Sequence, residues 1–290
     1  MKAFPSAALL ALTSLLSISC GGEALTSLES DDTPAASSDA TPPIANAQAH
    51  ATASGANAEP SVYRGPSVGA ARGFSALAHT SISAINGATV TGNLGVSGAK
   101  VQAIVGFDPP AYSFGTDSTP PNSLRTVLTQ QEISGLVGEL RARECDAPYP
   151  APASAASGVT LHPGVTCLND SDSEQLLSGR VILDAGGDPN AFFVVRSHST
   201  LTVADATQVV LANGAQACGV FWQADKGVSI GARVEFAGTV IAATGISLQS
   251  GSKLVGRLLA QSEAVSLDGN TIIIPTFDEN GGALKCSHEQ

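Results

Sequence analysis

The sequence predicts a mainly β fold, a β-solenoid of short strands with one long α-helix at about residues 123–144 packed along one face. The first observation is a repeat between Gly227 and Pro275, which divides into three lines that each open with an apolar residue, a serine and a second apolar residue. A self-similar step of about 20 residues, made of short β-rich runs punctuated by glycine, is typical of a solenoid. The serines of the three openings are Ser229, Ser247 and Ser266.

The second observation is a single long helix, which Asn122 or Ser123 can cap just after two prolines and which ends near Glu144. Apolar side chains recur along it at steps of three and four and form one stripe. Each is worth roughly 1.5–3 kcal/mol when buried, so the stripe must lie against a flat surface. Its members are Leu124, Val127, Leu128, Ile133, Leu136, Val137 and Leu140.

The composition favours stacked strands and argues against several classes of function. Aromatic residues make up only 4% of the chain while 30 residues are glycine, which suits tightly stacked strands better than a bulky helical core. The net charge of −11 argues against nucleic-acid binding, which needs clustered Lys and Arg. The five histidines are scattered and the common catalytic and metal-binding motifs are missing, so we expect no enzyme activity, no metal and no cofactor.

The N-terminus predicts an exported protein. Residues 1–19 read as a signal peptide, with Lys2, an apolar run and then small residues. Cys20 follows at once in a stretch that looks like a bacterial lipobox, in which the cysteine is acylated, although Ser17 stands where a leucine is usual. We expect an outer-membrane or cell-surface lipoprotein that touches the membrane only through a lipid on Cys20. Plain secretion is the alternative.

Three segments follow the signal peptide. Residues 20–61 begin with the cysteine and are rich in Ala, Ser, Thr and Pro, which predicts a disordered tether that holds a folded domain off the membrane. Residues 62–276 form the predicted solenoid domain, and residues 277–290 look like a C-terminal tail.

Four cysteines besides Cys20 allow three disulfide pairings. We favour Cys145–Cys167, which would staple the end of the helix to the returning strand, together with Cys218–Cys286, which would tie the tail to a central strand. Zinc binding is the rival use of these cysteines, but the chain has no Cys-x-x-Cys and no nearby histidine cluster.

Seven stretches of the chain, covering about residues 66–275, resemble the ice-binding-like protein family. They are Phe74–Ala78, Val90–Ser97, Asp184–Phe193, Ser199–Val203, Asn213–Ala217, Val220–Gln223 and Gly256–Gln261. The resemblance implies a discontinuous right-handed β-solenoid with three faces and one long helix alongside. It further implies that the helix covers one face and that another is flat and binds ice. Because not every member of a fold family keeps one activity, fold and function are separate expectations.

The alternation of side chains on the repeat predicts an apolar outward row for the helix. With Val240 and Leu258 pointing inward, Ile241 and Leu259 point outward. Aligning Gly219 with the glycine of the next coil adds Trp222 to the same outward row. A row of Trp222, Ile241 and Leu259 is too apolar for solvent, so we expect the helix stripe to pack on it.

A second outward row carries small hydroxyl groups. Ser229, Ser247 and Ser266 point outward between inward apolar neighbours, and Thr202 extends the row. Alternation in an earlier strand makes Thr89 and Thr91 further candidates. Coils stack ~4.7–4.9 Å apart, which gives a ladder of hydroxyls at nearly constant spacing. The plain alternative is that these residues are ordinary solvent-facing strand positions.

These observations predict a monomeric protein whose partner is an ice crystal surface and which inhibits recrystallisation or holds the cell to ice. We expect weak to moderate activity, because serine stands where the better binders of the family carry threonine, and because Gln249, Lys253 and Asp268 lie near the row. A structural or adhesive cell-surface module without ice affinity is the alternative, and a carbohydrate-binding protein is a third possibility that lacks outward aromatic residues.

Overall fold

The computed structural model describes residues 65–98, 104–107, 112–113, 124–149, 158–168, 174–277 and 286–287. All of them belong to the second of two units into which the chain divides, residues 56–290. The predicted signal peptide of residues 1–19, the lipidated Cys20 and the tether of residues 20–61 lie outside the described residues.

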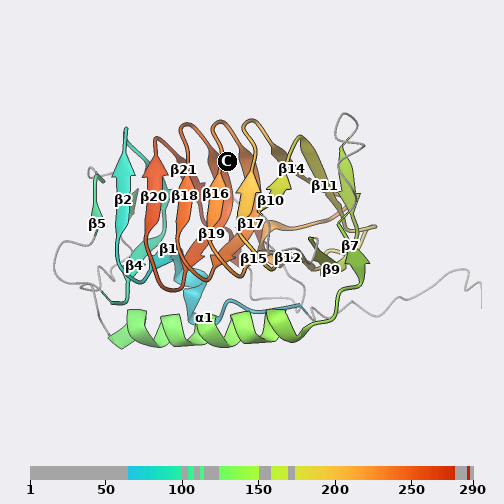
Figure 1. The fold of residues 1–290 in the computed structure, drawn as a ribbon, viewed down its shortest axis with the longest axis horizontal. Coiled ribbons are helices and arrows are strands. Elements are labelled where there is room, and N and C mark those ends of the chain that lie inside the picture. Colours follow the sequence, from blue (N-terminus) through green and yellow to red (C-terminus); the bar gives the residue numbers. More distant parts are fainter. Residues whose placement is uncertain are drawn as a thin grey trace, which may run out of the picture. The chain divides into compact units, whose positions relative to one another are not determined.

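The solenoid has three faces, and strands stack in parallel along each of them (Figure 1). We call the first the serine face, because the predicted serine row lies on it. It is a seven-stranded sheet. In order along the solenoid its strands are β10 (Gln175–Leu177), β13 (Leu201–Val203), β16 (Val228–Ile230), β18 (Ile246–Leu248), β20 (Val265–Asp268), β2 (Ile82–Ile85) and β5 (Ile104–Val105).

The other two faces belong to one 14-stranded sheet that bends at a corner. β17 (Glu235–Ala242) and β19 (Lys253–Ala260) run through both faces, and each carries a glycine at the bend. Gly238 has a φ of +116°, a conformation that favours glycine. A Cβ on Gly256 would lie 1.8 Å from the carbonyl oxygen of Gly238. The corner therefore requires glycine in both coils.

We call these two faces the helix face and the third face. The helix face combines the later parts of β17 and β19 with β4 (Asn93–Val96), β1 (Phe74–Ala78), β15 (Val220–Ala224), β12 (Phe193–Ser197), β9 (Gly164–Cys167) and β7 (Ala147–Pro148). The third face combines their first parts with β6 (Tyr112–Ser113), β3 (Thr89–Thr91), β21 (Thr271–Ile273), β14 (Gln208–Ala212), β11 (Arg180–Asp184) and β8 (Val159–Leu161). A short antiparallel pair, β22 (Thr276–Phe277) with β23 (Cys286–Ser287), follows.

The N-terminal strands stack on the C-terminal end of the solenoid. β1 pairs with β19, β2 with β20 and β3 with β21, all in parallel. Figure 1 shows cyan β2 directly beside red β20 on the serine face. The solenoid is therefore discontinuous in sequence, as the family resemblance implies.

Helix α1 (Leu124–Ala142) runs along the helix face (Figure 1), and the buried apolar residues of the helix lie in its second half. Four residues of the predicted stripe are buried there, in one cluster with Phe221, Ile241 and Leu259. They are Ile133, Leu136, Val137 and Leu140.

The first half of the helix differs from the predicted stripe. Leu124 and Leu128 are 74% and 49% exposed. The buried residues in these turns are instead Thr126, Thr129 and Gln130. The side-chain amide of Gln130 donates to two carbonyl oxygens at the end of β19, Ala260 O at 3.1 Å and Gln261 O at 3.1 Å. A polar contact thus replaces the expected apolar one.

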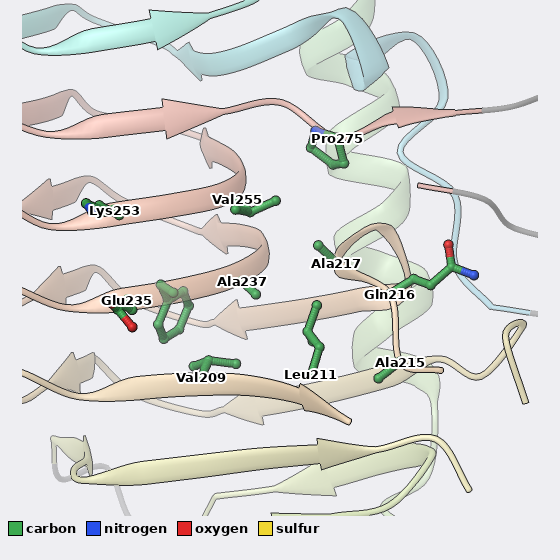
Figure 2. Close-up of a pocket in the computed structure, with 11 residues that line it drawn as sticks. Val209, Leu211, Ala215, Gln216, Ala217, Glu235, Ala237, Lys253, Val255 and Pro275 are labelled. Carbon is green, nitrogen blue, oxygen red and sulfur yellow. The ribbon is translucent and has the colours of Figure 1, made fainter. Parts of the chain in front are cut away.

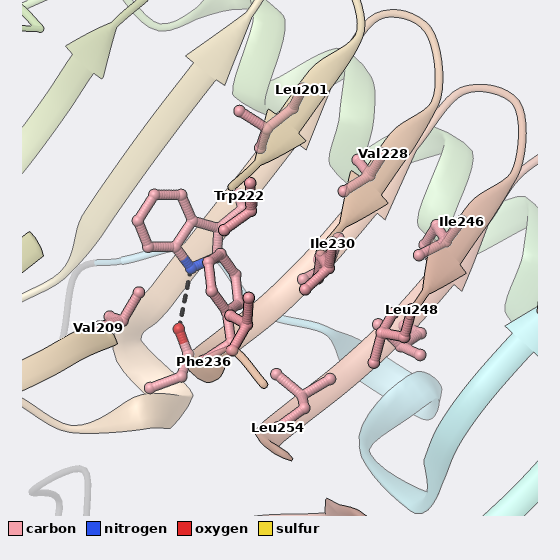
Figure 3. Close-up of a cluster of buried hydrophobic side chains, with 14 of the residues drawn as sticks. Leu201, Val209, Trp222, Val228, Ile230, Phe236, Ile246, Leu248 and Leu254 are labelled. Carbon is pink, nitrogen blue, oxygen red and sulfur yellow. Dashed lines mark hydrogen bonds between the residues drawn. The ribbon is translucent and has the colours of Figure 1, made fainter. Parts of the chain in front are cut away.

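Trp222 points into the solenoid core, so its predicted place on the outward helix row is wrong (Figure 3). Its side chain is fully buried, its indole N–H donates to Ala237 O at 2.9 Å, and its ring lies 4.8 Å from that of Phe236. Trp222 pairs with Val240 in the ladder, whereas the sequence alignment set it opposite Ile241.

The error has a local cause. Gly219 closes a 3-10 turn, η3 (Ala217–Gly219), before the strand and is not the corner glycine of its coil. A slip of one residue moves every side chain of a strand to its opposite side. Gln223 consequently stands opposite Ile241, and Phe221 is the aromatic residue of this strand that packs against the helix. Ile241 and Leu259 do face the helix, as predicted.

One of the two predicted disulfides lies entirely within the described residues. Cys145 and Cys167 are bonded with their Cα atoms 5.7 Å apart, which ties the end of α1 to β9. Cys218 is also disulfide-bonded. Its pairing with Cys286 stays a prediction, because the side chain of Cys286 lies outside the described part of the chain.

Candidate functional site

The serine face presents one straight outward row, which we call the hydroxyl row. The middle residue of β13, β16 and β18 is partly exposed while both of its neighbours are buried. The ladder pairs the outward residues of successive strands with one another. In order along the face they are Leu176, Thr202, Ser229, Ser247, Ser266, Ser83 and Val105.

The apolar neighbours explain why the hydroxyls point outward. Val228 and Ile230 flank Ser229, and Ile246 and Leu248 flank Ser247; all four are buried in the main core (Figure 3). Turning either strand over would expose both apolar residues and bury the serine hydroxyl, which costs free energy on each count. The core therefore fixes the direction of the row.

The hydroxyl groups of the row differ in their hydrogen bonds. The Ser229 and Ser247 oxygens lie 3.5 Å apart, at the limit of a hydrogen bond. The Thr202 hydroxyl donates to the Glu174 carboxylate. Within the described part of the chain, the hydroxyls of Ser266 and Ser83 make no hydrogen bond to protein and are open to water. From Ser229 to Ser83, the only hydrogen bond that a hydroxyl of the row makes to the described residues is therefore the long one between Ser229 and Ser247.

A second line of residues, which we call the second rank, lies parallel to the hydroxyl row. Its members stand two residues before the strands β16, β18, β20 and β2, and they are Lys226, Thr244, Glu263 and Thr80. The backbone N–H of Thr244 donates to Lys226 O and that of Thr80 to Glu263 O, each at 3.3 Å, so these residues stack from coil to coil. Between the rank and the row lies an open trough of about 590 Å³. Its lining includes Thr80, Thr244 and Glu263 of the second rank, Ser229, Ser247 and Ser266 of the row, and the small residues Gly227, Gly245 and Ala264 between them.

Limited space favours small residues in the trough. A Cβ on Gly245 would lie 3.0 Å from Ala264 O, and one on Gly227 would lie 3.2 Å from the Thr244 hydroxyl oxygen. Both contacts are tighter than ordinary side chains make, so the backbone itself forms the surface here. The serine face is consequently low in relief, with hydroxyls along one side of the trough.

Thr89 and Thr91 do not belong to this face, so their place among the candidates is wrong. Both lie on β3, which pairs with β21 on the third face. The Thr91 hydroxyl accepts a hydrogen bond from the Ile274 N–H at 3.0 Å. The residue that the N-terminal segment does contribute is Ser83, which pairs with Ser266 and is not among the predicted candidates.

Charged groups stand at the borders of the serine face. Glu174 lies at the Thr202 end, and Glu263 and Lys226 belong to the second rank. At the other end the Asn86 amide donates to the Asp268 carboxylate at 2.6 Å. No group of three or more His, Cys, Asp or Glu residues that could hold a metal ion occurs among the described residues. The face offers adsorption and no evident catalytic chemistry.

A separate apolar groove of about 440 Å³ lies on the third face (Figure 2). Val209, Leu211, Ala237 and Val255 line it, and the charged Glu235 and Lys253 stand at one side. It has no regular row of hydroxyls. In the described part of the chain, no helix is long and apolar enough to cross a membrane.

Comparison with known proteins points to one family. The family model described as ice-binding-like matches residues 76–273. A 220-residue match to the ice-binding protein of Nostoc sp. (strain HG1) is 32% identical and covers 71% of this chain and 72% of that protein. Ice-binding protein 1 of Shewanella frigidimarina (strain NCIMB 400) is 28% identical; the match covers 71% of this chain but only 26% of that longer protein.

The fold agrees with these sequence matches. The crystal structure of an ice-binding protein from an Antarctic biological consortium superposes with a TM-score of 0.64 at 30% identity, covering 76% of this chain and 96% of that one. The predicted β-solenoid with its flanking helix is thereby confirmed. The chain belongs to the ice-binding-like family, which is non-enzymatic.

Proposed function

We propose that this protein binds ice crystals and that it does so through the serine face. The single observation that carries the proposal is the row of four serines, Ser229, Ser247, Ser266 and Ser83, stacked in register on four neighbouring strands. An ice surface is a periodic array, so a rigid protein surface with a constant repeat of ~4.7–4.9 Å can order water over many coils at once.

The energetics suit many weak contacts. A single hydroxyl–water hydrogen bond contributes little net free energy, because it replaces a similar bond to liquid water. A rigid ladder loses little conformational entropy on binding, so small gains from each coil add up. The serine Cβ groups and the small residues of the trough supply apolar surface between the hydroxyls. Flatness and regularity matter more here than any one residue.

The other two faces fit this role less well. α1 covers the helix face and leaves little of it open to a crystal. The third face carries a ladder of long and charged side chains along its strands, including Arg180 beside Gln208 and Glu235 beside Lys253. Such side chains are mobile and strongly hydrated, which opposes a fixed layer of lattice-like water.

The cellular setting is part of the proposal. The signal-peptide pattern of residues 1–19 and the lipobox-like Cys20 favour export, with a lipid anchor or with plain secretion. A monomer held by a tether of residues 20–61 could either hold the cell to ice or inhibit recrystallisation at its surface. Labelling with a radioactive fatty acid, compared between the natural chain and a Cys20→Ser variant, tests the anchor.

One observation favours a second candidate, a structural or adhesive surface module without ice affinity. The charged residues Glu174, Lys226 and Glu263 stand at the borders of the serine face, and its hydroxyls are mostly serine. An ice-recrystallisation assay on the purified protein separates the two candidates. Ice grains that stay small at micromolar protein support ice binding. Normal coarsening of the ice grains at that concentration would contradict ice binding and favour the structural module.

A further inference from the structure

The Glu263 side chain leans over the glycine floor of the trough on the serine face. Glu263 stands in the second rank, one coil from Thr244 and directly beside Thr80. Its carboxylate oxygen Oε2 lies 3.2 Å, and its Cβ 3.4 Å, from the position that a Cβ on Gly245 would take. The side chain therefore leans back over the glycine of the neighbouring coil instead of projecting straight into solvent.

Nothing in the described part of the chain neutralises this charge. Glu263 is exposed, lines the trough and takes part in no ion pair among the described residues. Lys226, the cation of the same rank, stands two coils away with Thr244 between them. The Glu263 carboxylate accordingly keeps its own hydration shell, at a place where a docked crystal would need lattice-ordered water.

We propose that the Glu263 side chain limits the affinity of the serine face for ice through its negative charge, an inference that rests on the proposed function. Docking onto ice would strip or rearrange the water around the carboxylate, and removing an unpaired charge from water costs far more than removing a hydroxyl. Thr80 and Thr244, its neighbours in the rank, impose no such cost. Glu263 is thus a residue that sets the strength of the site without belonging to the hydroxyl row.

The structural role of Glu263 is carried by its backbone and can be separated from the side chain. Its carbonyl oxygen accepts the N–H groups of His79 at 3.1 Å and of Thr80 at 3.3 Å, which helps to hold the N-terminal strands on the last coil. A side-chain substitution keeps these bonds. The floor beneath the side chain is Gly245, so a shorter or neutral side chain also fits.

The test compares Glu263→Gln and Glu263→Thr with the natural protein. Both variants should inhibit ice recrystallisation at a protein concentration lower by on the order of three- to tenfold. The gain is modest because the Glu263 carboxylate stays partly exposed, and a partly exposed charge loses less hydration than a buried one. Glu144→Gln is the matched control: it removes the same charge from an exposed residue after α1 and should leave the active concentration unchanged. Thermal unfolding of each variant checks that the fold is intact.

The outcomes separate the inference from the proposed function. If the natural protein is active and Glu263→Gln is no more active than it, the inference is wrong while ice binding stands. If only Glu263→Thr gains, side-chain length and not charge is the obstacle, and the inference is again wrong. If the natural protein and both variants are inactive, ice binding and the inference fall together. If the natural protein is inactive and Glu263→Gln is active, the inference holds and natural ice binding does not.

Discussion

The side-chain oxygens of Ser229 and Ser247 lie 3.5 Å apart on neighbouring coils, and the residues on either side of each serine are buried. This pair is the centre of the hydroxyl row. The flanking residues fix the direction of both serine side chains. A substitution at Ser229 or Ser247 therefore changes the surface of the serine face without changing the core.

Ser247→Tyr should abolish ice binding and leave the fold intact. Ser247 lies between Ser229 and Ser266 in the ladder, so a tyrosine ring there would stand above both and keep a flat crystal away from the row. The position is partly exposed, so the ring need not enter the core. The measurement is recrystallisation inhibition against protein concentration, with thermal unfolding as the check on folding.

Thr160→Tyr is the matched control for this variant. Thr160 is an exposed outward residue of β8 on the third face, so the same ring is added away from the hydroxyl row. Activity should survive there. A fully active Ser247→Tyr protein would mean that the serine face is not the face that meets ice.

Trp222→Ala should destabilise the protein by about 3–5 kcal/mol, the usual range for removing a buried aromatic side chain. The ring is fully buried, and its loss would leave a cavity beside Phe236 and remove the indole hydrogen bond to Ala237 O. Urea unfolding measures the loss. Trp222→Phe should cost less, because it fills most of the space and loses only the N–H donor. Near-natural stability of Trp222→Ala would contradict the inward position of Trp222.

The same residue shows where sequence patterns stop being informative. The serine strands alternate between buried and exposed positions, so their direction can be predicted from the sequence. In contrast, all five residues of β15 are buried, because the core covers one side and the helix the other. A strand covered on both sides has no alternation to reveal its register. The alignment error of one residue at Trp222 follows from this lack of alternation. Gly219 contributed to the error, because in the sequence it resembles the corner glycine of the next coil.

The sequence also could not predict which sheet each N-terminal strand joins, because these strands stack on coils that are far away in the sequence. Alternation tells which residues share one side of a strand, but not which sheet the strand joins. Thr89 and Thr91 share a side of β3, yet β3 joins the third face, while Ser83 on β2 joins the hydroxyl row. Ile82-Ser83-Ala84 does carry the apolar-Ser-apolar pattern. Its place beside Ser266 depends on N-terminal strands docking on the last coil.

Gly256→Ala should destabilise the solenoid, whereas Gly135→Ala should stabilise it. A Cβ on Gly256 would lie 1.8 Å from Gly238 O, a clash with backbone that should cost about 3 kcal/mol, the upper end of the usual range for overpacking. A Cβ on Gly135, on the exposed side of α1, would meet nothing within 4 Å, and alanine there gains about 0.5–1 kcal/mol. Urea unfolding of both variants gives the comparison. Equal stability of the two would contradict the tight corner.

Asp225→Asn should weaken the protein at neutral pH but have little effect in acid. Burial raises the pKa of the Asp225 carboxyl, but hydrogen bonds from Gln223 and Arg141 outweigh this and lower the pKa below its usual value. The bond to Arg141 Nε, at 2.5 Å, connects the last turn of α1 to the solenoid. A carboxyl whose pKa is lowered by folding stabilises the protein above its unfolded pKa of about 3.9 and loses this contribution as the pH falls through its folded pKa.

The stability difference between the natural protein and Asp225→Asn should therefore be present at pH 7 and 5 and shrink at pH 3 and below. We expect at most about 1 kcal/mol at pH 7, because the Arg141 side chain is 45% exposed and water screens the pair. Glu139→Gln is the control, since it removes the surface pair between Glu139 of α1 and Arg143 just after the helix, and should change stability less. A difference that is equal at pH 7 and pH 3 would show that the Asp225 charge does not hold the end of the helix.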